Sequence, residues 1–78
     1  MTTQIDLSGL KCPLPALKTR KALRDLAPGE QIRVICTDPL SAIDIPSLLS
    51  DTGDRLLETK KQGGRIVFVI EKRVANGA

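Results

Sequence analysis

The sequence contains no histidine, tryptophan or tyrosine, and it has one phenylalanine among its 78 residues. Without histidine, the chain can form neither a Cys-His catalytic pair nor a histidine-containing zinc site. Its two cysteines, Cys12 and Cys36, are too few to make a structural zinc site alone, so we expect no bound metal. Single-strand nucleic-acid binding relies on aromatic stacking, so we do not expect direct nucleic-acid binding. The core must be built from Leu, Ile, Val and Ala.

Long apolar runs are also missing. No segment approaches the length of a membrane-spanning helix, and the first residues do not resemble a signal peptide. We therefore expect a soluble, cytoplasmic protein with no membrane partner. Two cysteines without an export signal do not suggest a structural disulfide. The length predicts a single domain over residues 1–78, with an ordered core at about 5–72, flexible ends and a monomeric state.

Apolar periodicity and turn residues predict the element order β-α-β-α-β-β. The expected strands cover residues 5–8, 31–37, 55–62 and 65–72, and the expected helices cover 13–26 and 41–53. Strand, helix and strand in succession imply a right-handed crossover, so the first two strands should be parallel and possibly adjacent. The chain is too short for a third layer, and both helices must cover one sheet face. The fold class is therefore an α/β two-layer sandwich with the other sheet face partly open.

The apolar run 66–70 does not alternate with polar residues, which is typical of a central strand. Either Val67 and Val69 or Phe68 should face the open side of the sheet. In the preceding strand, Cys36 shares an apolar face, so we expect it to be buried as a small hydrophobe.

The first helix is the basic part of a chain whose net charge is only +3. On its core face we expect Ala16, Thr19, Ala22, Leu23 and Leu26. Leu14 and Leu17 fall on the outer face together with Lys21 and Arg24, which suggests a docking surface for an acidic partner. The alternative is that isolated exposed leucines have no special role.

The start of the second helix allows two interpretations. Ser41 and Asp44 fit a capping box, which would begin the helix at Ser41 and place Pro46 in its early turns. Alternatively, the helix begins with Asp44 as its cap. Asp38-Pro39 before it favours a turn closed by the aspartate side chain.

The segment 9–15, Gly-Leu-Lys-Cys-Pro-Leu-Pro, holds the candidate reactive group. Gly9 ends the first strand, and Pro13 is predicted to be the first helical residue, with Cys12 capping the helix. The helix dipole and free N–H groups would then favour the Cys12 thiolate, which is the nucleophilic form. The alternative is that Cys12 is a small buried hydrophobe, although its neighbour Lys11 is hard to bury.

Residues 6–15 resemble the CPxP signature of the TusA, or SirA-like, sulfur-carrier family. The basic helix at 18–23, the turn at 28–30, Asp38-Pro39 and the segment 44–46 also resemble this family, so the resemblance covers about residues 5–72. It implies a two-layer sandwich with a four-stranded mixed sheet.

The resemblance also implies a function. Cys12 would accept a persulfide sulfur from a cysteine desulfurase or another sulfurtransferase and pass it to an acceptor protein, in a loop shaped by Pro13 and Pro15. The family serves tRNA thiolation, molybdenum-cofactor synthesis or sulfur metabolism, and the transfer needs no cofactor.

This sequence departs from the best-known family member near the cysteine. That member has an acidic residue where this chain has Leu14, and methionines where this chain has Leu17 and Lys18. Many members have histidine where this chain has Asp54. These differences lie on the expected docking surface, so they affect which partner proteins the chain can bind. The expected docking residues are Lys11, Leu14, Leu17, Lys18, Lys21 and Arg24.

Two other functions remain open at this point. A small basic domain suits a nucleic-acid-binding or regulatory module. A thiol redox protein would use Cys12 and Cys36, although the chain has no Cys-x-x-Cys motif.

Overall fold

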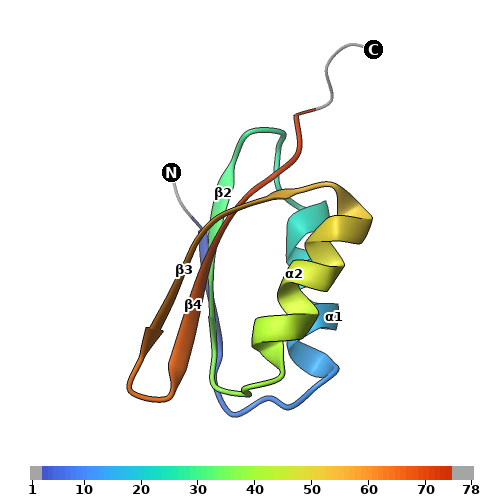
Figure 1. Cartoon of the computed structure of the whole chain (residues 1–78). Coiled ribbons are helices and arrows are strands. Elements are labelled where there is room, and N and C mark those ends of the chain that lie inside the picture. The colour runs from blue at the N-terminus through green and yellow to red at the C-terminus, as the bar shows by residue number, and fades with distance from the viewer. Residues whose placement is uncertain (1–2, 75–78) are drawn as a thin grey trace.

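A computed structural model of the chain describes residues 3–74 and contains four strands and two helices. The elements are β1 (Thr3–Leu7), α1 (Leu14–Arg24), β2 (Gln31–Cys36), α2 (Ser41–Thr52), β3 (Arg55–Gln62) and β4 (Arg65–Glu71). Their order is the predicted one, and both helices lie on the same side of the sheet (Figure 1). The predicted α/β two-layer sandwich is therefore confirmed. The flexible ends predicted from the sequence fall partly on residues 1–2 and 75–78, outside the described residues.

The four strands form one mixed sheet with the order β1-β2-β4-β3. β1 and β2 are parallel neighbours, as predicted, whereas β4 pairs antiparallel with both β2 and β3. β4 is thus a central strand, as its unbroken apolar run indicated. The ordered part begins earlier than expected, because Thr3 and Gln4 pair with Ile32 and Arg33 and so belong to β1.

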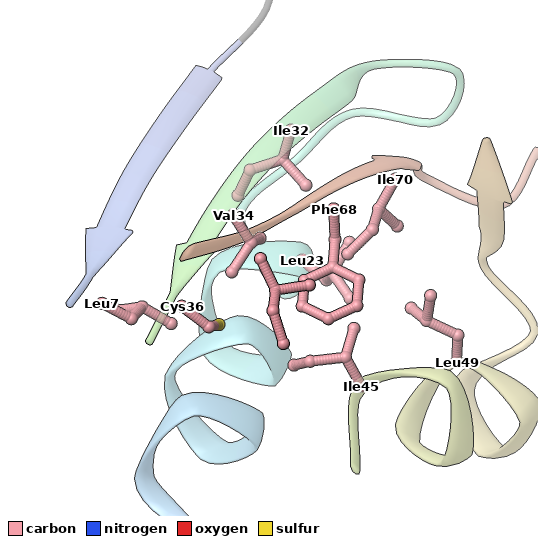
Figure 2. Close-up of a cluster of buried hydrophobic side chains, with 10 residues drawn as sticks. Leu7, Leu23, Ile32, Val34, Cys36, Ile45, Leu49, Phe68 and Ile70 are labelled. Atoms are coloured by element: carbon pink, nitrogen blue, oxygen red, sulfur yellow. The ribbon is translucent and has the colours of Figure 1, made fainter. Parts of the chain in front are cut away.

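The core lies between the helices and the covered face of the sheet (Figure 2). It contains the fully buried side chains of Phe68 and Ile70 from β4 and Ile45 from α2, packed with Leu23 of α1. Because side chains alternate along a strand, Val67 and Val69 point to the opposite face. The open face therefore carries Val67 and Val69, and the alternative that placed Phe68 there is wrong.

The two faces of α1 are those predicted from its periodicity. Thr19 and Leu23 are buried against the core, whereas Leu14 and Leu17 are 44% and 56% exposed. The predicted boundaries are too wide, since α1 begins at Leu14 and ends at Arg24. The outer side of α1 therefore presents two leucines within a basic surface.

The position at which α2 starts agrees with the first interpretation of the sequence, but its capping does not. The helix begins at Ser41 and runs without interruption through Pro46, so Asp44 is not its cap. The capping box is also wrong, because the Ser41 hydroxyl donates to the Asp38 carbonyl oxygen at 2.6 Å and no side chain caps the helix. Asp38 does close the predicted turn, with its carboxylate accepting the Leu40 N–H at 3.0 Å. The Asp44 carboxylate is therefore free for another partner.

Replacing Thr19 by valine is expected to stabilise the fold. The Thr19 hydroxyl is fully buried and has no hydrogen-bond partner among the described residues. A buried, unpaired polar group costs about 1–3 kcal/mol, and valine has nearly the same shape, so we expect a gain of about 1 kcal/mol in the free energy of unfolding. Urea denaturation of both proteins measures this difference. A loss of stability in Thr19→Val would mean that the hydroxyl makes a stabilising contact.

Candidate functional site

The loop at residues 8–13 connects β1 to α1 and lies beside the turn between β2 and α2 (Figure 1). This proximity follows from the parallel pairing of β1 and β2, whose C-terminal ends meet at one edge of the sheet. A hydrogen bond connects the loop to the residue after β2, because the Gly9 N–H donates to the Thr37 hydroxyl at 2.8 Å. The Gly9 φ of 82° lies in the left-handed region, which glycine adopts without strain.

Cys12 is exposed near the end of this loop, so the interpretation that it is a buried hydrophobe is wrong. Its backbone N–H donates to the Asp38 carboxylate at 2.6 Å, and the Cys12–Pro13 peptide bond is cis. The predicted capping role is also wrong. Pro13 occupies the N-cap position and Leu14 is the first helical residue, with no side-chain cap. The loop thus places Cys12 one residue before the cap.

Asp44 provides the second fixed contact of Cys12. The Cys12 Sγ–H donates to the Asp44 carboxylate, with 2.6 Å between Sγ and Oδ2. This hydrogen bond raises the pKa of the Cys12 thiol, and desolvation and the negative charges of Asp44 and Asp38 act in the same direction. The predicted activation of Cys12 as a thiolate by the helix terminus is therefore wrong for this arrangement.

The sequence pattern predicts a helix-capping role for Asp44, because its spacing from Ser41 fits a capping box. Its contact with Cys12 spans 32 residues. Asp44 lies in the segment 44–46, which resembles the family, and this resemblance could have marked it as a site residue. No local sequence pattern connects Asp44 with Cys12. The sequence predicts that Asp38 closes a turn, but it does not predict the contact between the Asp38 carboxylate and the Cys12 N–H. That bond, followed by the one from the Leu40 N–H, lowers the pKa of Asp38.

A groove of about 250 Å³ lies between α1 and α2, and Cys12 is part of its lining. Its lining includes Leu17 and Arg20 from α1 and Asp44 and Asp51 from α2. Of the expected docking residues, only Leu17 lines this groove. The other five are exposed but lie outside its lining: Lys11, Leu14, Lys18, Lys21 and Arg24. The structure therefore gives the cysteine an amphipathic groove on one side of α1.

The two prolines of the motif occupy different environments. Pro13 is exposed and lines the groove, whereas Pro15 is fully buried in the first turn of α1. Pro15 therefore anchors the start of α1 under the loop that carries Cys12. The expected loop-shaping roles of Gly9, Pro13 and Pro15 stay predictions.

Cys36 is fully buried at the end of β2, as predicted. Burial raises the pKa of its thiol, while a hydrogen bond with Ser41 opposes this effect. Both cysteines are free thiols. A redox pair with Cys12 would need an accessible partner, so the buried position of Cys36 argues against that alternative.

Residues 3–74 include no group of three or more His, Cys, Asp or Glu side chains placed to hold a metal ion. None of the helices formed by these residues is long and apolar enough to cross a membrane.

Comparison with known proteins gives consistent matches over nearly the whole chain. A protein-family model described as "Sulfurtransferase TusA" matches residues 3–72. The chain is 42% identical over 69 residues to the sulfur carrier protein TusA of Allochromatium vinosum, which covers 88% of this chain and 91% of that protein. Its identity to the sulfur carrier protein TusA of Pseudomonas aeruginosa is 38% over 69 residues, with 88% and 87% covered.

The fold also resembles a solved structure. The crystal structure of a SirA-like protein from Desulfitobacterium hafniense superposes with a TM-score of 0.80 at 26% sequence identity. The superposition covers 95% of this chain and all of the other.

Proposed function

We propose, from the premise that this chain belongs to the TusA family of sulfur carrier proteins, that it carries sulfur as a persulfide on Cys12. The observation that carries this proposal is the contrast between its two thiols. Cys12 is exposed and lines a groove, whereas Cys36 is fully buried in the core. A sulfur carrier must present its sulfur to two partners in turn, and Cys12 is the accessible thiol.

The chemistry is an exchange at sulfur. The Cys12 thiolate attacks the outer sulfur of a donor persulfide, R–S–SH. The donor S–S bond breaks, a new S–S bond forms on Cys12, and the departing donor thiolate takes up the proton that Cys12 lost. The products are R–SH and the Cys12 persulfide, so no outside oxidant or reductant is needed. An acceptor thiolate then attacks the outer sulfur in the same way, and its rate depends on thiolate fraction and access, as in thiol–disulfide exchange.

The partners are a sulfur donor and a sulfur acceptor, both proteins. The donor is a cysteine desulfurase or another sulfurtransferase. The acceptor serves tRNA thiolation, molybdenum-cofactor synthesis or sulfur metabolism, and the exchange takes place in the cytoplasm.

The outer side of α1 is the proposed docking surface. Leu14 and Leu17 supply exposed apolar area close to Cys12, and basic side chains surround them. The basic members are Lys11, Lys18, Lys21 and Arg24. An acidic partner surface with an apolar centre complements this arrangement, because charges steer the encounter and buried apolar anchors hold the complex.

Intact-protein mass measurement tests the carrier role. Incubation with inorganic polysulfide, or with a cysteine desulfurase and cysteine, is expected to add one sulfur atom that a reductant removes and that maps to the peptide containing Cys12. If neither source loads Cys12, the carrier proposal is wrong.

The same measurement tests the docking surface. Leu17→Glu and Lys21→Glu are expected to slow loading by the desulfurase about tenfold, the effect of about 1.4 kcal/mol in binding. Loading by polysulfide should not change, because a small anion needs no docking surface. Leu57→Glu and Lys61→Glu on β3 are matched exposed controls. Equal slowing in the β3 variants would contradict the assignment to α1.

A further inference from the structure

Two carboxylates from the same stretch of chain hold Cys12. Asp38, in the turn before α2, accepts the Cys12 backbone N–H at 2.6 Å. Asp44, in the first turn of α2, accepts the Cys12 Sγ–H at the same distance. A carboxylate that accepts a hydrogen bond from a thiol stabilises the thiol over the thiolate, because ionisation would place two negative charges side by side. The resting carrier therefore holds Cys12 in its less nucleophilic form.

The charged groups around this contact leave Asp44 without a positive partner. Asp38 and Asp51 add negative charge, and Lys11 and Arg20 are the nearby basic residues on the loop and on α1. Within residues 3–74, no ion pair joins Asp44 to any of the basic side chains. Among the described residues, the Cys12 thiol is the one hydrogen-bond donor to the Asp44 carboxylate. A cation brought into the groove would pair with Asp44 and compete with the thiol for it.

We propose that Asp44 is a positioning residue that keeps Cys12 protonated in the free carrier and releases the thiolate when a cationic group of the sulfur donor enters the groove. This inference rests on the proposed function, since it assigns the donor a basic side chain beside its persulfide. Once the cation neutralises Asp44, ionisation of Cys12 no longer creates adjacent unbalanced charges. The thiol loses its proton, attacks the outer sulfur, and the proton passes to the departing donor thiolate.

The same two carboxylates also act on the loaded carrier when it transfers its sulfur to an acceptor. A loaded Cys12 that carries its outer sulfur as an anion has no proton to donate to Asp44. The two carboxylates then repel it, which directs the outer sulfur away from α2 and toward an acceptor.

Alkylation by iodoacetamide across pH tests the role of Asp44. In Asp44→Asn the negative charge is lost and the amide can donate to the thiolate, so the Cys12 pKa should fall and the rate profile should shift to lower pH. A lower pKa enlarges the thiolate fraction near neutral pH, so the alkylation rate there should rise severalfold. Asp51→Asn removes a carboxylate from the same groove that makes no hydrogen bond with Cys12, so it should shift the profile clearly less than Asp44→Asn does. An unchanged or slower reaction in Asp44→Asn would overturn the proposal.

A second measurement starts from the wild-type protein. Methanethiosulfonate reagents carrying a quaternary ammonium, a sulfonate or no charge react with thiolates and differ mainly in charge. With rates normalised to those of free cysteine, the cationic reagent should modify the wild-type protein about fivefold faster than the uncharged reagent and about thirtyfold faster than the anionic one, because one negative charge about 4 Å away in water contributes about 1 kcal/mol of attraction or of repulsion. The preference should shrink in Asp44→Asn. Lys11 and Arg20 predict the opposite order, so faster reaction with the anionic reagent would overturn the proposal.

These readouts separate the inference from the carrier function. Polysulfide loading of wild-type Cys12 decides whether the chain carries sulfur, and it does not depend on a cationic donor. If loading succeeds but Asp44→Asn shifts neither the pH profile nor the reagent preference, the inference alone is wrong. If wild-type Cys12 fails to load, the carrier function is wrong, and the assignment of a cationic sulfur donor fails with it.

Discussion

Cys12→Ser is expected to abolish sulfur loading while the fold stays intact. The serine hydroxyl is not ionised near neutral pH and cannot attack a persulfide sulfur, so no persulfide forms. Stability should change little, because Cys12 is exposed and a hydroxyl can keep the hydrogen bond with Asp44. Intact mass after polysulfide treatment measures loading, and thermal unfolding measures the fold.

The matched control for this prediction is Cys36→Ala. It removes the other thiol, which is fully buried, and should load one sulfur as the wild type does despite a modest loss of stability. Sulfur gained by Cys12→Ser would refute the assignment of the carrier cysteine. So would loss of loading in a Cys36→Ala protein that is still folded.

Phe68→Ala is expected to have the largest effect on stability. Phe68 is fully buried at the centre of β4 and is the single aromatic residue of the chain. Figure 2 shows its ring among side chains from α1, α2 and the sheet. Truncation of a buried phenylalanine costs about 3–5 kcal/mol, a large part of the roughly 5–15 kcal/mol that stabilises a typical domain. Urea denaturation should show a much lower midpoint or no folded baseline.

Val69→Ala provides the comparison for Phe68→Ala. Val69 is the next residue on the same strand, but it lies on the open face and is only partly buried. Its truncation should cost clearly less than that of Phe68. Equal costs would mean that the helix-covered face is not the main source of stability.

The fold was largely predictable because its signals are local. Ile32, Val34 and Cys36 alternate with other residues along β2, and the structure buries all three. The run 66–70 lacked such alternation, so the sequence alone could not decide which face of β4 meets the helices. That choice depends on register, and the pairing of Val34 with Phe68 settles it.

The site was predictable only in part. The place of the Cys12 loop follows from the predicted parallel pairing of β1 and β2, since parallel strands bring their C-terminal ends together. The chemistry of the thiol was not predictable, because helix-capping rules assign local roles to Ser41 and Asp44. In the folded chain, Ser41 bonds back to Asp38 and Asp44 reaches Cys12, 32 residues away. Contacts of this length depend on the packing of α1 against α2, which no local pattern encodes.

β3 is one of the two edge strands of the sheet, and its free edge affects whether molecules of this protein can pair with one another. All eight of its residues are exposed, and it pairs with β4 on one side only. An uncovered edge of this kind is a template for strands from other molecules, yet Lys60, Lys61 and Glu58 place charges along it. A register shift between Leu56 and Glu58 further interrupts its regular hydrogen-bonding edge. These features oppose edge-to-edge aggregation through β3, whereas the monomeric state expected from the sequence stays a prediction.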